Sequence, residues 1–508
     1  MVRVEVPLEH LFDPITSIWL RKWIVSITQD NKIKFKDNPK NNQKESNYCV
    51  INPIDYCSVG CKHCLYSAKL TNKRECPKIS LKDSKKLSKI LTEANMKQIV
   101  FSGGGEPLEN LKTVLYLMNN VSTLEEVVII TSAFFAKTKR VTEEILNKIL
   151  NIAKKKEISL ILRISRDNAQ QANVPLEYIK NIIDFKKKDK KYCSLFSIIF
   201  RTLIGEDQNQ DKLISELCSL EIHPIRRFPI IDGLPVKWFI DKGLKLEIPV
   251  IYKPLYFTGR AKKIQGKSYS LWKIVRDEEK SGGLFNLSIR GPRGQGHNYY
   301  GELLKGYSSW RRKGSPLNLS SPFKKEDKSL ALYITADSTL ILNDGVLDNF
   351  FHIKNLADWK SFISYQYSDI LQRAVIFKGP LFIMSIIEEV DKNLKKKIEK
   401  QNFVFLINSL SLETPQKRLY LTLRLLEEGL KEGRLVIKNS QLYNLVIRGK
   451  DYFKKLYHEA ESWDFSYPLR KKRSPLDPIK GDELSIIPKE NIFYASKSPE
   501  EFLSSLSE

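Results

Sequence analysis

Residues 126–165 read EVVIITSAFFAKTKRVTEEILNKILNIAKKKEISLILRIS, and this stretch decides the fold class. Its first seven and last eight residues are short apolar runs, typical of strands that are buried on both faces. Between them, residues 142–156 have helical spacing, with acids in the first turn and lysines in the last, as the helix dipole favours. The stretch therefore predicts two parallel strands joined by a helical crossover.

The same alternation continues on both sides of this unit. Six apolar strands are predicted at 48–54, 97–102, 126–132, 158–165, 194–204 and 245–255, and five helices at 82–94, 107–120, 142–156, 175–187 and 210–220. This order predicts a parallel sheet with helical crossovers, an α/β fold. A closed or partial (β/α) barrel and an open doubly wound sheet both satisfy the pattern, and periodicity does not choose between them.

The rest of the 508-residue chain follows other patterns. Residues 30–47 are polar and predict a linker or an exposed hairpin. Beyond about residue 260 the alternation stops; residues 330–345 are strand-like, and a helical section begins near Asp358. Residues 414–449 combine a helix with RLVIK-NSQ-LYNLVIRG, which predicts a two-stranded hairpin and hence a winged-helix-like unit.

Composition and charge bear on the cellular location of the protein and on its binding partners. No apolar run approaches the roughly 18 residues that a membrane span requires, and the N-terminus lacks the apolar core of a secretory signal. We therefore expect a cytoplasmic protein with no membrane partner. The formal net charge is +25, but Lys outnumbers Arg, and readers of nucleic acids rely on the Arg guanidinium. The charge leaves a nucleic acid as an alternative partner.

Three of the seven cysteines are crowded into CSVGCKHC (57–64), with the spacing C-x3-C-x2-C. An odd cysteine count without an export signal argues against a disulfide framework. A structural zinc site wants four ligands, and His63 between two cysteines is awkwardly placed to bind the same ion. A [4Fe–4S] cluster held by three thiolates instead leaves one iron open to a small molecule. The loop follows the first predicted strand, at the edge of the sheet where ligands bind.

CSVGCKHC after the first strand and VFSGGGEP (100–107) at the end of the second together resemble the radical S-adenosylmethionine (SAM) superfamily. The resemblance implies a partial (β/α)6 TIM-like barrel with a [4Fe–4S] cluster on Cys57, Cys61 and Cys64. It implies that SAM is bound by Gly103, Gly104, Gly105, Glu106, Pro107, Thr131, Ser132, Ser165, Arg166, Asp167 and His63. Glycine lets the backbone approach a ligand closely, and a carboxylate accepts hydrogen bonds from an ammonium group. His63 stands where the family usually has an aromatic residue.

The region after the barrel resembles the SPASM or twitch extension of peptide- and protein-modifying members. Such extensions normally hold auxiliary clusters, yet no cysteine lies beyond Cys218. We therefore expect an α+β, partly helical C-terminal extension without an auxiliary cluster. The expected domains are an N-terminal segment (1–45), the radical SAM core (46–260), a cluster-free extension (261–370) and a mainly helical domain (371–508).

The resemblance also implies the chemistry. An external one-electron reductant, flavodoxin- or ferredoxin-like, drives cleavage of SAM to a 5′-deoxyadenosyl radical, which abstracts hydrogen from a substrate. The expected substrate is a ribosomal peptide or a protein side chain. The alternatives are radical modification of a nucleic acid or nucleotide, and a non-enzymatic scaffold that binds a metal through the three cysteines.

Overall fold

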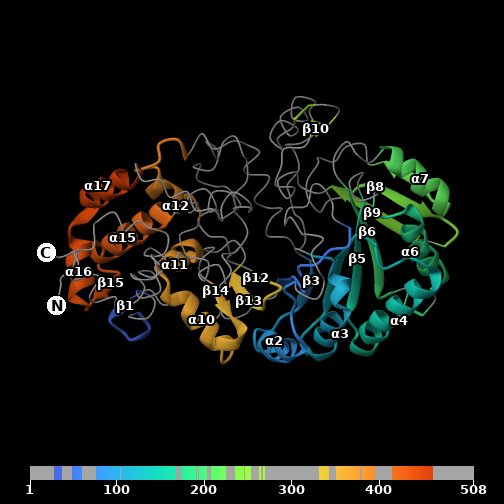
Figure 1. Ribbon diagram of the computed structural model, residues 1–508, viewed down its shortest axis with the longest axis horizontal. Helices are drawn as coiled ribbons and strands as arrows, with labels where there is room; N and C mark the ends of the chain where they lie inside the picture. Colours follow the sequence, from blue (N-terminus) through green and yellow to red (C-terminus); the bar gives the residue numbers. More distant parts are fainter. Residues whose placement is uncertain are drawn as a thin grey trace.

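The computed structural model of the chain is shown in Figure 1. It describes residues 24, 28–36, 48–59, 76–102, 105–166, 173–189, 191–192, 194–202, 208–224, 235–244, 246–252, 263–264, 267–268, 331–342, 350–377, 380–394 and 415–461.

One sheet of eleven strands dominates the fold, in the order β14-β13-β12-β2-β3-β4-β5-β6-β9-β8-β7. Its parallel centre consists of β2 (Tyr48–Ile51), β3 (Gln98–Phe101), β4 (Glu126–Thr131), β5 (Ser159–Ser165), β6 (Phe196–Thr202) and β9 (Leu246–Tyr252). These are the six strands that the sequence predicts, in the predicted order.

The connecting helices are α2 (Leu81–Glu93), the 3-10 turn η3 (Pro107–Asn110) with α3 (Leu111–Asn120), α4 (Lys139–Lys156), α6 (Leu176–Lys188) and α7 (Gln208–Cys218). Each of these helices contacts the next, and they line the outside of the sheet (Figure 1). From β2 to β9 the parallel strands lie side by side in the order in which they occur in the chain. Because the crossovers are right-handed, this order places all the connecting helices on the same face of the sheet. A doubly wound sheet requires a reversal. The described edge strands, β14 and β7, do not pair with each other, so the fold is a partial barrel, as predicted.

Both edges of the sheet carry strands from outside the regular alternation. On one edge, β12 (Ala331–Ile334) pairs in parallel with β2, followed by antiparallel β13 (Thr339–Leu342) and β14 (Phe350–His352). On the other edge, β8 (Pro235–Asp241) pairs antiparallel with β9, and β7 (Glu221–Pro224) pairs antiparallel with β8. The strand-like character predicted for 330–345 is thus confirmed by β12 and β13, which form a hairpin. Its place beside β2, and the β7–β8 pair, were not predicted. A further hairpin joins β10 (Lys263–Ile264) to β11 (Lys267–Ser268).

The helix faces pack as their spacing predicts. In α2, Leu87, Ile90 and Leu91 are buried against the sheet, and the Ser80 hydroxyl caps the helix by accepting the backbone N–H of Asp83 at 3.0 Å. The buried residues of α2, α3, α4 and α6 join the strands in one hydrophobic core. This core fixes the sheet edge at which β2, β3, β4 and β5 end.

The helical section begins where the sequence predicts. Asp358 is the N-cap of α10 (Trp359–Ser368), and its carboxylate accepts the N–H of Ser361 at 2.7 Å. The helices α11 (Ile370–Phe377), α12 (Pro380–Ile387), α15 (Pro415–Lys431), α16 (Ser440–Ile447) and α17 (Gly449–Glu461) follow. No helix in the described ranges is both long and apolar enough to cross a membrane.

The hairpin predicted within 414–449 is wrong. Its first half is strand β15 (Leu435–Ile437), but its second half is helix α16. The Asn439 side chain caps α16 by accepting the N–H of Leu442 at 2.9 Å, and Leu442, Leu445 and Val446 bury one helical face. The partner of β15 is β1 (Ile33–Phe35), from the segment that was expected to be a linker or hairpin.

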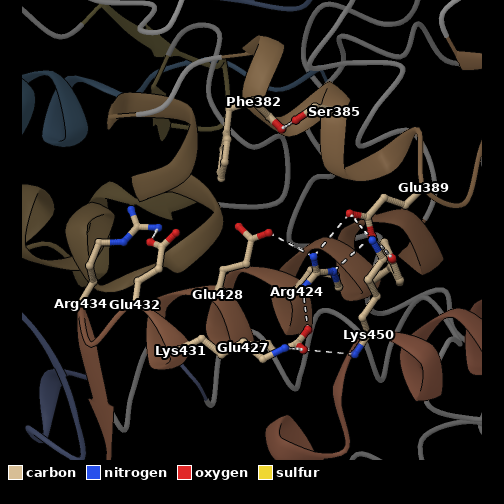
Figure 2. A network of polar contacts seen from close by, with 11 residues as sticks. Phe382, Ser385, Glu389, Arg424, Glu427, Glu428, Lys431, Glu432, Arg434 and Lys450 are labelled. Atoms are coloured by element: carbon tan, nitrogen blue, oxygen red, sulfur yellow. Dashed lines mark hydrogen bonds and ion pairs between the residues drawn. The ribbon is translucent and has the colours of Figure 1, made fainter.

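A charged network ties α15 to its neighbours (Figure 2). Arg424 of α15 lies between Glu389, which follows α12, and Glu427 and Glu428 of its own helix. Lys450 of α17 also reaches Glu389, at 2.9 Å. Arg424 and Glu427 are buried, so each depends on the other for compensation of its charge.

Candidate functional site

The two ends of the cysteine-bearing loop, which follows β2, are held together by backbone hydrogen bonds. The backbone N–H of Asp55 donates to the carbonyl of Pro77 at 2.9 Å, and that of Ile79 donates to the carbonyl of Pro53 at 3.0 Å. Asn110, just after GGGEP, donates its side-chain amide to the carbonyls of Pro53 (2.9 Å) and Ile79 (3.1 Å). Both ends of the loop, at residues 53–55 and 77–79, are therefore fixed in place close to the end of β3.

The glycine-rich turn touches this loop directly. A Cβ built on Gly105 would lie 2.1 Å from the carbonyl oxygen of Ile54 and 2.3 Å from that of Tyr56, distances that no real side chain shows. The backbone N–H of Glu106 donates to the Tyr56 carbonyl at 2.9 Å. Glycine at position 105 is thus required by the close approach of the backbone of Ile54 and Tyr56, the segment that ends just before Cys57.

The Glu106 carboxylate is buried and points at the end of β4. One oxygen accepts the Thr131 hydroxyl at 2.6 Å, and the other accepts the Ser132 hydroxyl at 2.7 Å and the Ser132 N–H at 2.9 Å. All three donors are neutral, and the described residues place no Lys, Arg or His in an ion pair with Glu106. Burial raises the pKa of Glu106, and the hydrogen bonds from Thr131 and Ser132 offset only part of that rise.

A strained residue shapes this end of β4. Ala133 has a φ of 70°, in the left-handed region that alanine rarely adopts. Its backbone N–H donates to the Thr131 hydroxyl oxygen at 3.0 Å, and the N–H of Phe134 donates to the Ser132 hydroxyl oxygen at 3.3 Å. The turn thereby orients both hydroxyls toward Glu106. Strained backbone of this kind concentrates at functional sites.

The start of the cysteine segment is held by two further side chains. The Ser58 hydroxyl donates to Glu109 of η3 at 2.6 Å, and the Asn173 amide donates to the carbonyl of Val59 at 2.8 Å. Cys57 itself is partly exposed. Glu109 could have been suspected from its place just after GGGEP, whereas no local pattern singles out Asn173.

Arg166, a predicted SAM-binding residue, is held by partners within the protein. Its side chain is completely buried, is ion-paired with Asp211 of α7, and lies 5.3 Å from the ring centres of both Phe200 and Phe239. Lys237 pairs with the same Asp211. Arg166 is thus engaged within the protein, although its Nε and Nη1 have no hydrogen-bond partner in the described parts of the chain. Contact with SAM stays a prediction for this residue.

The other predicted site residues divide into two groups. Pro107, the first residue of η3, and Ser165, the last of β5, are buried at the same sheet edge as Glu106 and Thr131. The remaining ones lie outside the described residues: Cys61, His63, Cys64, Gly103, Gly104 and Asp167.

The chemistry of the described groups fits the proposed cofactors. Cys57 offers a partly exposed thiol on a fixed loop, which suits cluster ligation. Glu106 is a buried carboxylate that has three neutral donors and a remaining acceptor position, which suits a cation such as an ammonium group. These two groups come from loops in direct backbone contact.

Comparisons with known proteins address the same segment. A family described as a 4Fe–4S single cluster domain matches residues 49–170, from β2 to just beyond β5, and this range contains all three cysteines and GGGEP. No curated protein matches the sequence. A solved structure titled "Crystal structure of HydG: A maturase of the [FeFe]-hydrogenase" matches at 13% identity, covering 82% of this chain and 94% of that chain. Its TM-score of 0.27 is too low to support an argument about fold or activity.

The family match, the cysteine spacing and the contact between the two motifs all point to one assignment. Residues 49–170 are similar to a 4Fe–4S single cluster domain, and the three cysteines of this segment are the candidates to hold that cluster.

Proposed function

We propose that this chain is a radical SAM enzyme that cleaves SAM reductively and uses the resulting radical to modify a peptide or protein side chain. The cleavage of SAM, the first half of this proposal, rests on the buried carboxylate of Glu106, which Thr131 and Ser132 hold in place. The backbone of Glu106 is also hydrogen-bonded to the cysteine loop. A buried carboxylate with only neutral donors is costly unless a cation binds beside it.

In this proposal Cys57, with Cys61 and Cys64, holds the cluster. When bound, the [4Fe–4S] cluster would supply the one-electron reduction needed to cleave SAM to the radical that takes hydrogen from the substrate. Glu106 accepts the ammonium group of SAM, while Thr131 and Ser132 fix the orientation of its carboxylate. Gly105 lets the backbone of both loops approach closely, so that the cysteine side and the carboxylate side keep a fixed separation.

The cleavage half is tested by anaerobic reconstitution with iron and sulfide. We expect a brown protein that forms 5′-deoxyadenosine from SAM when dithionite is added. Glu106→Gln should keep the cluster absorbance but lose most of the 5′-deoxyadenosine, and Glu143→Gln on the exposed face of α4 should behave as the wild type. A colourless protein that binds zinc would overturn the proposal and favour the metal-binding scaffold.

The substrate half is supported by the extension beside β2. The backbone N–H of Asn52, at the base of the cysteine loop, donates to the carbonyl of Ile334 in β12 at 2.8 Å. A segment from the second half of the chain therefore pairs with the strand that leads into the cysteine loop. Such an arrangement suits a polymer that contacts both the barrel and the extension while one side chain reacts.

Deuterium transfer distinguishes the substrate classes. The reduced enzyme, supplied with SAM and an electron donor such as a flavodoxin or ferredoxin, would be incubated with deuterated peptides or with deuterated RNA. Deuterium appearing in 5′-deoxyadenosine from the peptides alone is the expected result. Transfer from the RNA alone would replace the peptide assignment with nucleic-acid modification and leave the cleavage half intact.

A further inference from the structure

A two-stranded ribbon joins the two ends of the described chain. Strand β1 pairs antiparallel with β15, with Ile33 opposite Ile437 and Phe35 opposite Leu435. Two more hydrogen bonds extend the pairing: the N–H of Lys36 donates to the carbonyl of Arg434 at 2.8 Å, and the N–H of Lys438 donates to that of Lys32 at 2.7 Å. Figure 1 shows this ribbon beside α15 and α16, apart from the end of the molecule that β5, β6 and β9 occupy.

The inward face of the ribbon is packed on helices. Ile33, Leu435 and Ile437 are buried, and the guanidinium of Arg373 in α11 lies 4.1 Å from the ring centre of Phe35. Gly429 of α15 allows close packing, since a Cβ there would lie 2.5 Å from the Leu435 side chain. The ribbon is therefore anchored with a fixed orientation.

Because side chains alternate along a strand, the other residues face outward. The outward row of β1 is Lys32, Lys34 and Lys36, all exposed. The outward row of β15 is Arg434, Val436 and Lys438, with Val436 directly opposite Lys34. Five of the six side chains on this face are thus cationic.

Acidic side chains offset little of this charge. Glu432 pairs with Arg434 (Figure 2), and Asp30 precedes the first lysine of the row. The four lysines have no ion-pair partner within the described parts of the chain. Neighbouring strands lie about 4.8 Å apart and alternate residues about 7 Å apart, so the four lysines are held close together on a rigid support, beside Arg434 in its ion pair with Glu432.

We propose that this basic ribbon face, made of Lys32, Lys34, Lys36, Arg434 and Lys438 around Val436, is a docking surface for an acidic polypeptide segment. Its charge is complementary to Asp and Glu side chains, which alternate along an extended peptide at the same spacing as the lysines. Like charges on a rigid face repel one another, and an anionic partner relieves that repulsion.

The composition of the face favours a polypeptide over a nucleic acid. It carries one Arg and no aromatic side chain, whereas single-stranded nucleic acids are bound through stacked aromatics and duplexes through Arg forks. Val436 at its centre offers an apolar contact that a phosphate backbone cannot use. Helix α16, which follows directly, exposes Tyr443 and Ile447 one turn apart, which adds apolar surface for peptide side chains.

The docking surface is a separate site from the cluster. The proposal stands whether or not the chain modifies a peptide, because binding to the basic ribbon face needs neither cluster nor SAM. Its failure would leave cleavage of SAM untouched, and failure of the cleavage assay would leave the docking result untouched.

The test is fluorescence anisotropy with the full chain and a labelled peptide in which Glu alternates with Val. We expect binding at low salt that weakens as salt is added, and a loss of about tenfold in affinity in Lys34→Glu/Lys36→Glu. The matched control is Lys82→Glu/Lys85→Glu, which makes the same charge change on exposed positions of α2 and should bind as the wild type. Circular dichroism and thermal unfolding establish that both variants fold.

Two outcomes would overturn the docking surface. One is equal affinity of the wild type and Lys34→Glu/Lys36→Glu for the Glu–Val peptide, or no binding at low salt. The other is tighter binding of a labelled single-stranded RNA that depends on the same two lysines, which would make the ribbon a nucleic-acid surface. A milder variant, Lys34→Gln/Lys36→Gln, should show an intermediate loss and guards against an effect of introduced acids.

Discussion

The backbone N–H of Glu106 donates to the carbonyl of Tyr56 at 2.9 Å, which joins the glycine-rich turn to the segment that leads into Cys57. The carboxylate of the same residue is fixed by Thr131 and Ser132 at the end of the next strand. A single residue therefore links the cysteine loop, the turn after β3 and the turn after β4. A change that breaks the backbone contact should therefore affect cluster loading, whereas a change confined to the Glu106 carboxylate should affect SAM binding.

Gly105→Ala should disrupt the cysteine loop. The new Cβ would overlap backbone atoms of Ile54 and Tyr56, which cannot rotate away, so the variant should lose about 1–3 kcal/mol of stability and most of its cluster. Iron content and urea unfolding are the measurements. Gly243→Ala is the control, because its Cβ would meet its nearest neighbour, Asp241, at an ordinary 3.5 Å. Equal iron content in both variants would contradict the role given to this contact.

Glu106→Gln should weaken SAM binding and change how stability depends on pH. Burial raises the pKa of Glu106 above its usual 4.5, so the folded state holds the proton to higher pH than the unfolded state. The stability of the cofactor-free wild type, relative to Glu106→Gln, should therefore fall as pH rises from about 4.5 through the raised pKa. Urea unfolding of both proteins across this range measures the difference. Parallel curves would show that the carboxyl is not destabilised by its burial.

Cys57→Ala should abolish the cluster, whereas Cys218→Ala should retain it. Cys218 is buried in α7, and burial, with the nearby Asp184 carboxylate, raises the pKa of its thiol to about 12. It should therefore stay unmodified by iodoacetamide at about pH 8 in the folded protein, because the thiolate is the reactive form. Mass spectrometry of the alkylated protein and the visible absorbance of the reconstituted variants check both statements. Rapid alkylation of Cys218 would contradict its burial.

Arg424→Met should destabilise the C-terminal helices by about 3 kcal/mol, since it removes the buried guanidinium that Glu389, Glu427 and Glu428 share. Although burial acts to raise it, the pKa of Glu389 lies below its usual value because of hydrogen bonds from Arg424, Tyr420 and Lys450. This contribution is present above about pH 4.5 and is lost as pH falls through the lowered pKa. Thermal unfolding should thus show the largest difference from wild type at neutral pH and a smaller one in acid.

The control for this network is Lys148→Met on α4. Lys148 forms an exposed pair with Glu144 at 2.7 Å, and exposed pairs contribute at most about 1 kcal/mol. A loss in Arg424→Met no larger than in this control would show that the network does not hold α15 to α12 and α17.

The parts of the fold that the sequence predicted are those with a local signal. Each central strand is a short apolar run and each crossover helix has its own apolar stripe, so element type and order could be predicted from neighbouring residues. The prediction of a hairpin at 434–449 was wrong because the apolar residues of LYNLVI fit both the spacing of a strand and the spacing of a helix. The Asn439 cap and the buried face of Leu442 and Val446 decided for the helix.

The sequence alone determined the parallel α/β core and the two motifs of the site, because cysteine spacing, glycines and apolar periodicity are written within short segments. Only the tertiary structure decided that Ser132 and Thr131 hold Glu106, that Arg166 turns to Asp211, and that β12 extends the sheet beside β2. The pairing of β1 with β15, about 400 residues apart in the chain, and the basic ribbon face that this pairing forms are likewise visible only in the tertiary structure. These contacts join residues that are distant along the chain, and their partners are selected by packing of the whole core rather than by any local pattern.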